Sequence, residues 1–151
     1  MPLEWQHDGF TVSTDPARLD VSAIHASLSA SYWAKGIPRD VLERAITHSL
    51  PFGIYEGVRQ VGFARMVTDR ATVGYLADVY VLEEFRGRGL SRFLMRCVLE
   101  HPELQGFRRS FLVTRDAHGL YAKFGFTPLA APERWLEKST PDVYAQASKP
   151  A

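Results

Sequence analysis

Apolar positions recur at two different spacings along the first third of the chain. Phe10 to Asp15 alternates between apolar and polar residues, as a short strand does. Residues 21–33 repeat their apolar positions at helical spacing, with Asp20 placed to cap the helix. A second helical stripe lies within residues 35–50, where Pro38 suits the first turn. This part of the chain is therefore expected to contain one strand and two helices.

Three segments rich in β-branched and aromatic residues follow, at 51–57, 59–69 and 71–85. Turn-like residues separate them, which predicts three consecutive antiparallel strands with a hairpin at Glu56 to Gln60. The last of these strands is apolar on both faces around Val79, so we expect it in the interior of the sheet.

The remaining pattern predicts a helix after a glycine-rich stretch, a strand within 108–116 and a short helix over 117–125. Two short final strands are expected at 126–129 and 133–138. This order of elements predicts one α/β or α+β domain, residues 1–151, built around a mixed sheet.

Composition and charge argue against several classes of protein and of site. A net charge of +1 does not favour nucleic-acid or membrane binding. The single cysteine, Cys97, allows no intramolecular disulfide, and no stretch approaches the length of a membrane span. The N-terminus lacks the features of a signal peptide, so a cytoplasmic location is the default expectation. No group of His, Cys and Asp has metal-ligand spacing, and no metal is expected.

The stretch Arg86-Gly87-Arg88-Gly89-Leu90-Ser91 stands directly before a helical pattern. A helix start presents unpaired N–H groups and a partial positive charge, which suits a phosphate. A plain tight turn is the alternative. A P-loop is excluded because the chain has no Gly-Lys pair, and Arg92 replaces the third glycine of a dinucleotide fingerprint. A single RGRG in a chain of balanced charge argues against RNA binding.

This stretch resembles the acyl-CoA-binding motif Arg/Gln-x-x-Gly-x-Gly/Ala of the GNAT family of N-acetyltransferases, with Arg86, Gly89 and Ser91 at the motif positions. Ser91 departs from the usual small apolar residue. A second segment resembles the family's Asn-x-x-Ala-x-x-Leu-Tyr-x-Lys-x-Gly-Phe, with Thr114 where Asn is common. The residues that match it are Ala117, Leu120, Tyr121, Lys123, Gly125 and Phe126.

The resemblance implies a mixed, mostly antiparallel sheet that opens into a V and is flanked by about four helices. It implies acetyl-CoA as the cosubstrate. The residues that it places along the cofactor are Val79, Tyr80, Val81, Arg86, Gly87, Arg88, Gly89, Leu90, Ser91, Thr114, Ala117 and Tyr121. The strand residues would bond the pantetheine arm, and the turn would hold the pyrophosphate.

The reaction implied is attack of a primary amine on the thioester, with release of a CoA thiolate. Tyr121 is the candidate acid for that thiolate, carried over from the family motif. The alternative is a tyrosine that only packs. Asp78 is a candidate base because it interrupts an apolar strand, and a salt bridge is its alternative.

The acceptor is expected between the first helices and the strands. Tyr32, Trp33 and Tyr55 are the candidate substrate-binding residues, and core packing is their alternative. The acceptor itself, a small molecule or a peptide amine, stays open, and a homodimer is possible. A non-catalytic acyl-CoA sensor on the same fold is the alternative function, against which Tyr121 favours an enzyme.

Overall fold

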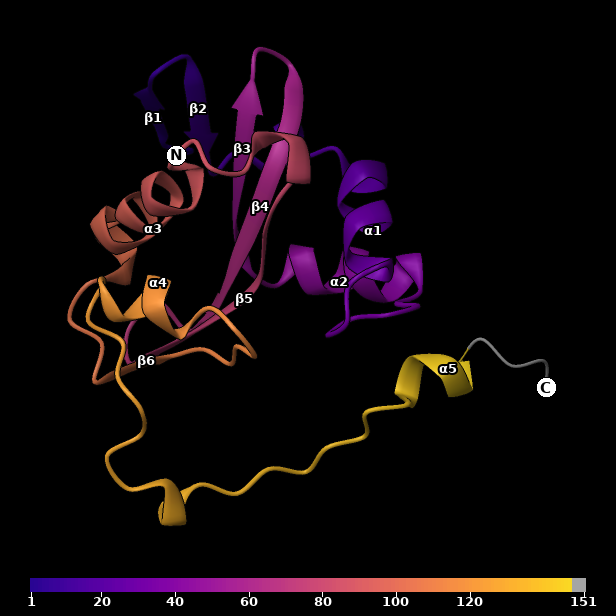
Figure 1. Cartoon of the computed structure of the whole chain (residues 1–151), viewed down its shortest axis with the longest axis vertical. Helices are drawn as coiled ribbons and strands as arrows, with labels where there is room; N and C mark the ends of the chain where they lie inside the picture. The colour runs from indigo at the N-terminus through magenta and orange to yellow at the C-terminus, as the bar shows by residue number, and fades with distance from the viewer. Residues whose placement is uncertain (148–151) are drawn as a thin grey trace.

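A six-stranded sheet with the strands in chain order runs through residues 1–147, the part of the chain that the computed structural model describes (Figure 1). The strands are Glu4–His7 (β1), Phe10–Ser13 (β2), Leu50–Glu56 (β3), Arg59–Thr68 (β4), Val73–Val81 (β5) and Arg109–Phe111 (β6). The helices are Val21–Ser29 (α1), Arg39–Thr47 (α2), Leu90–Glu100 (α3), His118–Ala122 (α4) and Val143–Ala147 (α5). None of the helices within 1–147 has the length and apolar character needed to span a bilayer.

Strands β1 to β5 pair antiparallel with their neighbours, and β6 pairs parallel with β5. The three strands predicted in the middle of the chain are confirmed, including the hairpin between β3 and β4, where Gly57 has a φ of 60°. The connection from β5 to β6 runs through α3, because parallel neighbours need a crossover. β5 therefore lies in the interior of the sheet, as its apolar faces predicted.

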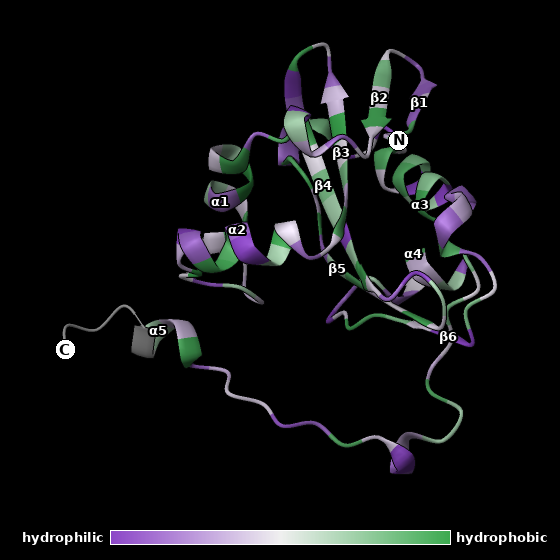
Figure 2. Cartoon of the chain, turned by 180° about the vertical axis from the view of Figure 1, so that it is seen from behind, coloured by the Kyte–Doolittle hydropathy of each residue, from purple (hydrophilic) through white to green (hydrophobic). Residues whose placement is uncertain are grey.

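Helices cover both faces of the sheet, and each face has its own core. On one face, α3 packs Phe93, Leu94 and Val98 against the strands, as its apolar stripe predicted. On the other face, α1 and α2 bury Ile24 and Leu42 against Phe63 of β4. The strands between them are mostly apolar along their length (Figure 2). The sheet is thus a mixed α/β layer structure, the predicted fold class.

The sheet opens between its last two strands. β5 pairs with β6 only from Val73 to Tyr75, and within residues 1–147 no strand pairs with residues 76–81 on that side. The predicted opening of the sheet into a V is therefore present, and it begins immediately after Tyr75.

Two elements differ from the sequence-based expectation. The strand β1 was not predicted, because Glu4–His7 is short and polar at the sheet edge. The prediction of two final strands, at 126–129 and 133–138, is wrong. Pro128 and Pro132 lack the N–H that a ladder requires, and Pro132 opens a 3-10 turn that ends at Arg134. In that part of the chain the backbone runs away from the sheet (Figure 1).

The packing of α3 makes a stability prediction. Replacing the fully buried Leu94 with Ala leaves a cavity and should lower the free energy of unfolding by about 2–5 kcal/mol. Leu99 lies on the exposed side of the same helix, so Leu99→Ala is the control and should change stability by less than about 0.5 kcal/mol. Urea denaturation followed by circular dichroism measures both. Equal losses in the two variants would contradict this assignment of the buried face.

Candidate active site

A β-bulge lies in β5 at the edge of the opening. Ala64 of β4 faces two residues of β5, Asp78 and Val79, because Phe63 pairs with Tyr80 while Arg65 pairs with Ala77. Asp78 takes the extra position with a φ of 57°, in the left-handed region that aspartate tolerates better than most residues. A bulge bends its strand and disrupts pairing locally, so it fits the place where β5 and β6 separate.

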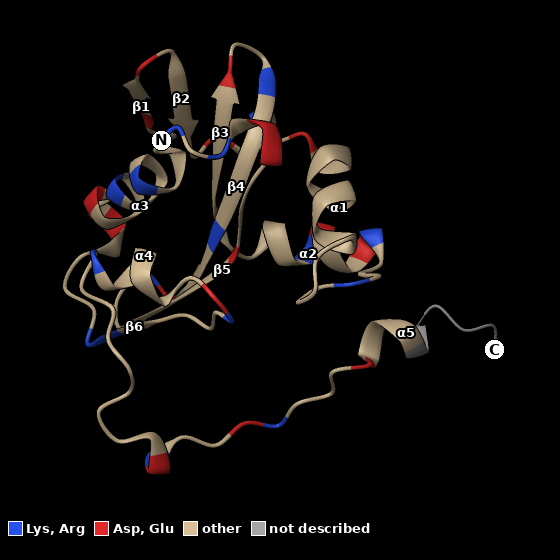
Figure 3. Cartoon of the chain, viewed as in Figure 1, with Lys and Arg blue, Asp and Glu red and all other residues tan. Residues whose placement is uncertain are grey.

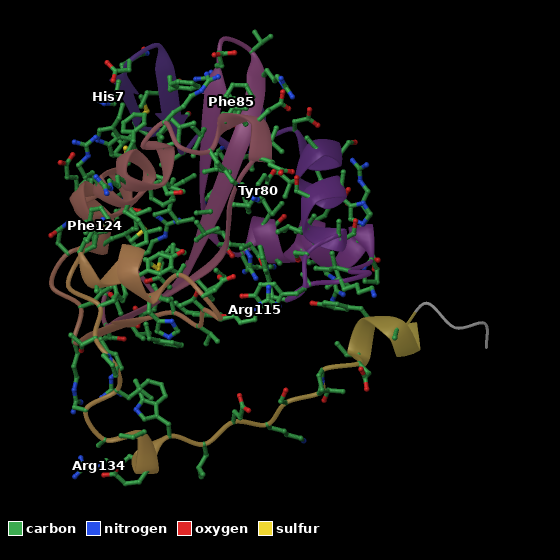
Figure 4. The ribbon with its side chains drawn as sticks, viewed as in Figure 1. His7, Tyr80, Phe85, Arg115, Phe124 and Arg134 are labelled. Atoms are coloured by element: carbon green, nitrogen blue, oxygen red, sulfur yellow. The ribbon has the colours of Figure 1, made fainter. Side chains whose placement is uncertain are left out.

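Beyond the bulge, β5 presents an edge with which no strand of the described residues pairs. Val79 and Val81 face the core beneath α3, whereas Tyr80 faces α1 (Figure 4). The predicted cofactor residues of this strand thus divide between two faces, and within residues 1–147 no strand pairs with the edge that they share. Such an edge can bond the amides of an extended ligand as an added strand would.

The glycine stretch forms an open turn before α3. Gly87 and Gly89 have φ values of 79° and 75°, and Gly89 occupies the N-cap of α3 without a side-chain cap. Within the described chain, no hydrogen bond is made to the backbone N–H groups of residues 87–92. A Cβ atom added at Gly87 or Gly89 would meet nothing within 4 Å. The turn therefore exposes unpaired donors at a helix start, which suits an anion.

The arginines of this turn have different surroundings. Arg88 lies over the ring of Phe85, with its guanidinium carbon 5.2 Å from the ring centroid, and Arg59 lies at the same distance from that ring. The Nε of Arg86 donates to the carbonyl of Val81 at 3.2 Å, which closes the end of β5. Arg88 and Arg92 are thus exposed beside the open turn, while the side chain of Arg86 folds back onto the strand.

The second predicted motif builds the start and end of α4. The hydroxyl of Thr114 accepts from the N–H of Ala117 at 3.1 Å and so supports the first turn. At the other end, Gly125 has a φ of 90°, and the N–H of Phe126 donates to the carbonyl of Tyr121 at 3.2 Å, closing a Schellman motif. The local sequence therefore fixes the short helix that carries Tyr121.

Tyr121 is a buried tyrosine on the α3 side of the sheet, where its ring meets Phe126 edge-on at 6.1 Å. Within the described chain, its hydroxyl has no hydrogen-bond partner. Burial raises the pKa of Tyr121 above its usual value, and the neighbouring Tyr32 adds to that rise. Tyr121 is therefore a neutral hydroxyl at neutral pH, able to donate a proton.

Asp78 is held by two donors. Arg65 Nε donates to one carboxylate oxygen at 2.6 Å, and Trp33 Nε1 donates to the other at 2.9 Å. The side chains of Asp78 and Arg65 are 9% and 18% exposed, so the pair is largely removed from water. Arg65 also donates to the Ser49 hydroxyl at 3.1 Å. These contacts bear out the salt bridge that was the alternative for Asp78, and its role as a base stays a prediction.

The loop between α1 and α2 lies across the opening of the sheet. Trp33 ties it to β5 through Asp78, and Tyr32 ties it to the segment after β6. There the N–H of Arg115 donates to the Tyr32 hydroxyl at 3.2 Å, and the Arg115 guanidinium lies 3.8 Å from the ring centroid (Figure 4). Both aromatic side chains are exposed. The structure thus brings Tyr32, Trp33, Asp78 and Tyr121 to one region.

Tyr55 does not share that exposure. Its side chain is 1% exposed, with the Arg18 guanidinium 4.3 Å from its ring centroid. The hydroxyl of Tyr55 is buried without a hydrogen-bond partner in the described chain, and desolvation raises its pKa to about 12. The core packing that was the alternative for Tyr55 is present, and its contact with an acceptor stays a prediction.

The chain matches a known protein family over most of its length. The model of the acetyltransferase (GNAT) family matches residues 20–126, which include the open turn, β5, β6 and α4. The chain belongs to the GNAT family. A relative from Gibberella zeae, described as a candidate acetyltransferase, is 39% identical over 145 residues, with 81% of each chain covered.

Solved structures agree with this GNAT assignment. A candidate GNAT acetyltransferase from Xanthomonas campestris is 50% identical with a TM-score of 0.90, covering 93% of this chain and 99% of that one. A structure from Clostridium acetobutylicum, described as an acetyltransferase with acetyl-CoA, has 17% identity and a TM-score of 0.62. It covers 92% of this chain and 96% of that chain, and at this identity it shows the shared fold alone.

Two residues of this GNAT site were not singled out from the sequence, Arg65 and Arg115. Arg65 interrupts the apolar strand β4 just as Asp78 interrupts β5, and two opposite charges in neighbouring strands were a readable signal. Arg115 follows β6 without any local pattern that marks it. In residues 1–147, no group of three or more His, Cys, Asp or Glu side chains is arranged to hold a metal ion.

The Asp78–Arg65 pair makes a prediction for stability. Asp78→Ala leaves a largely buried guanidinium without its carboxylate and should lower the free energy of unfolding by about 3–5 kcal/mol. Glu43→Ala breaks an exposed pair with Arg39 on α2 and should cost only about 0.3–0.5 kcal/mol. Urea denaturation curves compare the two. A loss in Asp78→Ala no larger than in Glu43→Ala would show that the pair does not stabilise the bulge.

Proposed function

We propose that this GNAT protein transfers an acetyl group from acetyl-CoA to a primary amine of a small molecule or peptide. The observation that carries the proposal is the row of unpaired N–H groups over residues 87–92, at the start of α3 and just after the uncovered edge of β5. The N–H groups at the helix start suit a phosphate, and the edge of β5 suits an extended amide chain. CoA carries both groups in one molecule.

The cosubstrate would then lie across the opening of the sheet. Its pyrophosphate would take the N–H groups between Gly87 and Ser91, with the Arg88 guanidinium nearby. Its pantetheine amides would bond the backbone of β5 from Val79 to Val81. Thr114 and Ala117 would border the same space from the α4 side. This arrangement is supported by the family's use of acetyl-CoA and directs the thioester toward Tyr121.

The chemistry requires an amine nucleophile, a place for the oxyanion and a proton for the leaving thiolate. The neutral amine attacks the thioester carbonyl, and the tetrahedral intermediate collapses by breaking the C–S bond. The attacking nitrogen loses its extra proton to solvent water, and Tyr121 donates its hydroxyl proton to the departing sulfur. The burial that raises the pKa of Tyr121 keeps that proton in place until the sulfur carries charge. The Tyr121 hydroxyl then regains a proton from solvent, so the products are the neutral amide and CoA thiol.

The acceptor would enter beneath the loop that carries Tyr32 and Trp33, whose exposed rings meet edge-on at 5.1 Å. An aromatic pair of this kind gives an amine substrate apolar contact and a favourable ring face. At this end, Asp78 is proposed to position Trp33 by accepting the hydrogen bond from its indole N–H. Asp78 would act as the base for the amine only after the hydrogen bonds from Trp33 and Arg65 break.

The seat of the pyrophosphate is tested by Gly89→Glu. The new carboxylate would stand at the N-terminus of α3 and repel phosphate, so the thermal stabilisation by acetyl-CoA should disappear. A saturating ligand stabilises the folded state by ~2.7 kcal/mol at a hundredfold excess over its dissociation constant, which is readily seen in the unmodified chain.

Gly57→Glu is the matched control for that variant. Gly57 also has a positive φ, a Cβ there also meets nothing within 4 Å, and it lies in the β3–β4 turn. Strain and charge are therefore the same, and only the position differs. If acetyl-CoA stabilises Gly89→Glu as well as it stabilises Gly57→Glu, the proposed seat is incorrect.

The acid is tested by Tyr121→Phe. The turnover number should fall by about 10²–10⁴-fold, the usual share of general acid catalysis, while the affinity for acetyl-CoA stays unchanged. In the unmodified chain, the Tyr121 hydroxyl should lose its proton, and its role as an acid, only as the pH rises through its raised pKa. Steady-state rates across a panel of amines measure this. Unchanged turnover in Tyr121→Phe would remove Tyr121 from the mechanism, and CoA binding without any transfer would identify a sensor.

A further inference from the structure

Arg115 places a guanidinium at the opening of the sheet that is held in position but makes no hydrogen bond within the described chain. Its guanidinium carbon lies 3.8 Å from the centroid of the Tyr32 ring, and its backbone N–H donates to the hydroxyl of the same ring at 3.2 Å. Among residues 1–147, no oxygen accepts a hydrogen bond from this guanidinium. Because a guanidinium that lies on a ring keeps the N–H groups of its edges free, Arg115 is ready to bind a planar anion.

The neighbouring carboxylate of Asp116 does not satisfy Arg115. The closest nitrogen and oxygen of the two side chains are 3.9 Å apart, which is longer than a hydrogen bond. The two side chains are 65% and 71% exposed, and ion pairs between such exposed groups are weak. A carboxylate that reached Arg115 from solution would therefore displace little.

The contacts of Tyr32 connect Arg115 to the candidate active site. Burial raises the pKa of Tyr121, and Tyr32 adds to that rise, so the two hydroxyl groups lie within electrostatic reach of each other. Trp33 meets Tyr32 edge-on at 5.1 Å and donates to Asp78 at 2.9 Å. Arg115 therefore lies at the rim of the same opening in which the thioester is proposed to lie.

Aromatic rings line this opening where β5 and β6 separate. Tyr75 stacks on Phe111 with 5.0 Å between the ring centroids and 11° between the planes, and these two residues form the last pair of the parallel ladder. Both side chains are half-buried. Burial raises the pKa of Tyr75, and Asp78 adds to that rise, so Tyr75 lies near the bulge. The acceptor end thus offers apolar ring surfaces inside and a cation at its rim.

The charges around the opening favour a negative group on the acceptor. Both carboxylate oxygens of Asp78 already accept hydrogen bonds. The loop at 30–38 carries one charged residue, Lys35, and it is positive and exposed (Figure 3). Apart from the exposed Asp116, the charge left without a close partner here is therefore positive. A second cation on the acceptor would be repelled, whereas an anion would be attracted.

Resting on the proposed function, we infer that the acceptor is a primary amine that also carries a carboxylate, and that this carboxylate binds the guanidinium of Arg115. The planar fork of a single guanidinium matches a carboxylate with two parallel hydrogen bonds. A carboxylate fixed at the rim leaves the amine of the same molecule free to extend inward toward the thioester. Arg115 is thus a binding residue that both selects the acceptor and orients it for attack.

The test uses a panel of amino acids, each paired with its own carboxamide, so that only the carboxylate differs within a pair. The unmodified chain should acetylate an amino acid with a kcat/KM about tenfold or more above that of its carboxamide. Arg115→Gln should lower kcat/KM for the amino acid by about tenfold or more and change it for the carboxamide by less than about twofold. Arg115→Lys keeps the charge without the fork and should restore only part of the preference.

Arg96→Gln is the matched control for these variants. Arg96 is an exposed arginine on α3, on the opposite face of the sheet from the loop at 30–38, and its replacement should leave the preference for the carboxylate unchanged. Phosphoethanolamine serves as a phosphate-bearing amine, and a higher kcat/KM for it than for every amino acid would overturn the carboxylate assignment. Equal rates for amino acids and carboxamides, or an unchanged preference in Arg115→Gln, would overturn the inference while acetyl transfer itself stands.

Binding provides a second readout that needs no transfer. Calorimetric titration of the amino acids into the chain saturated with CoA should give a dissociation constant that rises about tenfold or more in Arg115→Gln and stays unchanged in Arg96→Gln. Such binding without acetylation of any amine would remove the proposed function and leave the carboxylate site in place. Acetylation of carboxamides together with amino acid binding that ignores Arg115 would do the reverse.

Discussion

The ion pair between Asp78 and Arg65 is the interaction on which the arrangement of the site depends. It joins β5 to β4 at the bulge, where a non-glycine residue takes a left-handed backbone conformation. A bulge leaves backbone groups out of the regular ladder, and a strong side-chain contact offsets that loss. Trp33 uses the second carboxylate oxygen, so the same aspartate also positions the loop over the opening. One largely buried carboxylate thus links the opening of the sheet to its cover.

The opening of the sheet and the turn before α3 are suited to one ligand because both leave backbone groups unpaired. Along β5 the unpaired groups face the space beside β6, and at residues 87–92 they face solvent at a helix start. Proteins rarely leave so many backbone groups unpaired without a ligand or water to receive them. The helix N-terminus favours a negative group, whereas the strand edge favours an extended amide chain. This pairing of preferences is why CoA is a better candidate than a nucleotide alone.

By itself, the sequence determined the features that depend on neighbouring residues. Periodicity marked α3 and the three central strands, because the apolar face of an element repeats along it. The glycines before Leu90 and the segment around Tyr121 marked the turn and the short helix, since their backbone conformations are local. Only the tertiary structure decided which residues meet across the sheet. The strand register places Arg65 beside Asp78, and the fold brings Tyr32 to Arg115 across the opening of the sheet. The fold also buries Tyr55 beneath the Arg18 guanidinium. The predicted strands at 126–129 and 133–138 are absent because Pro128 and Pro132 cannot donate to a ladder, and within the described chain these residues pair with no strand.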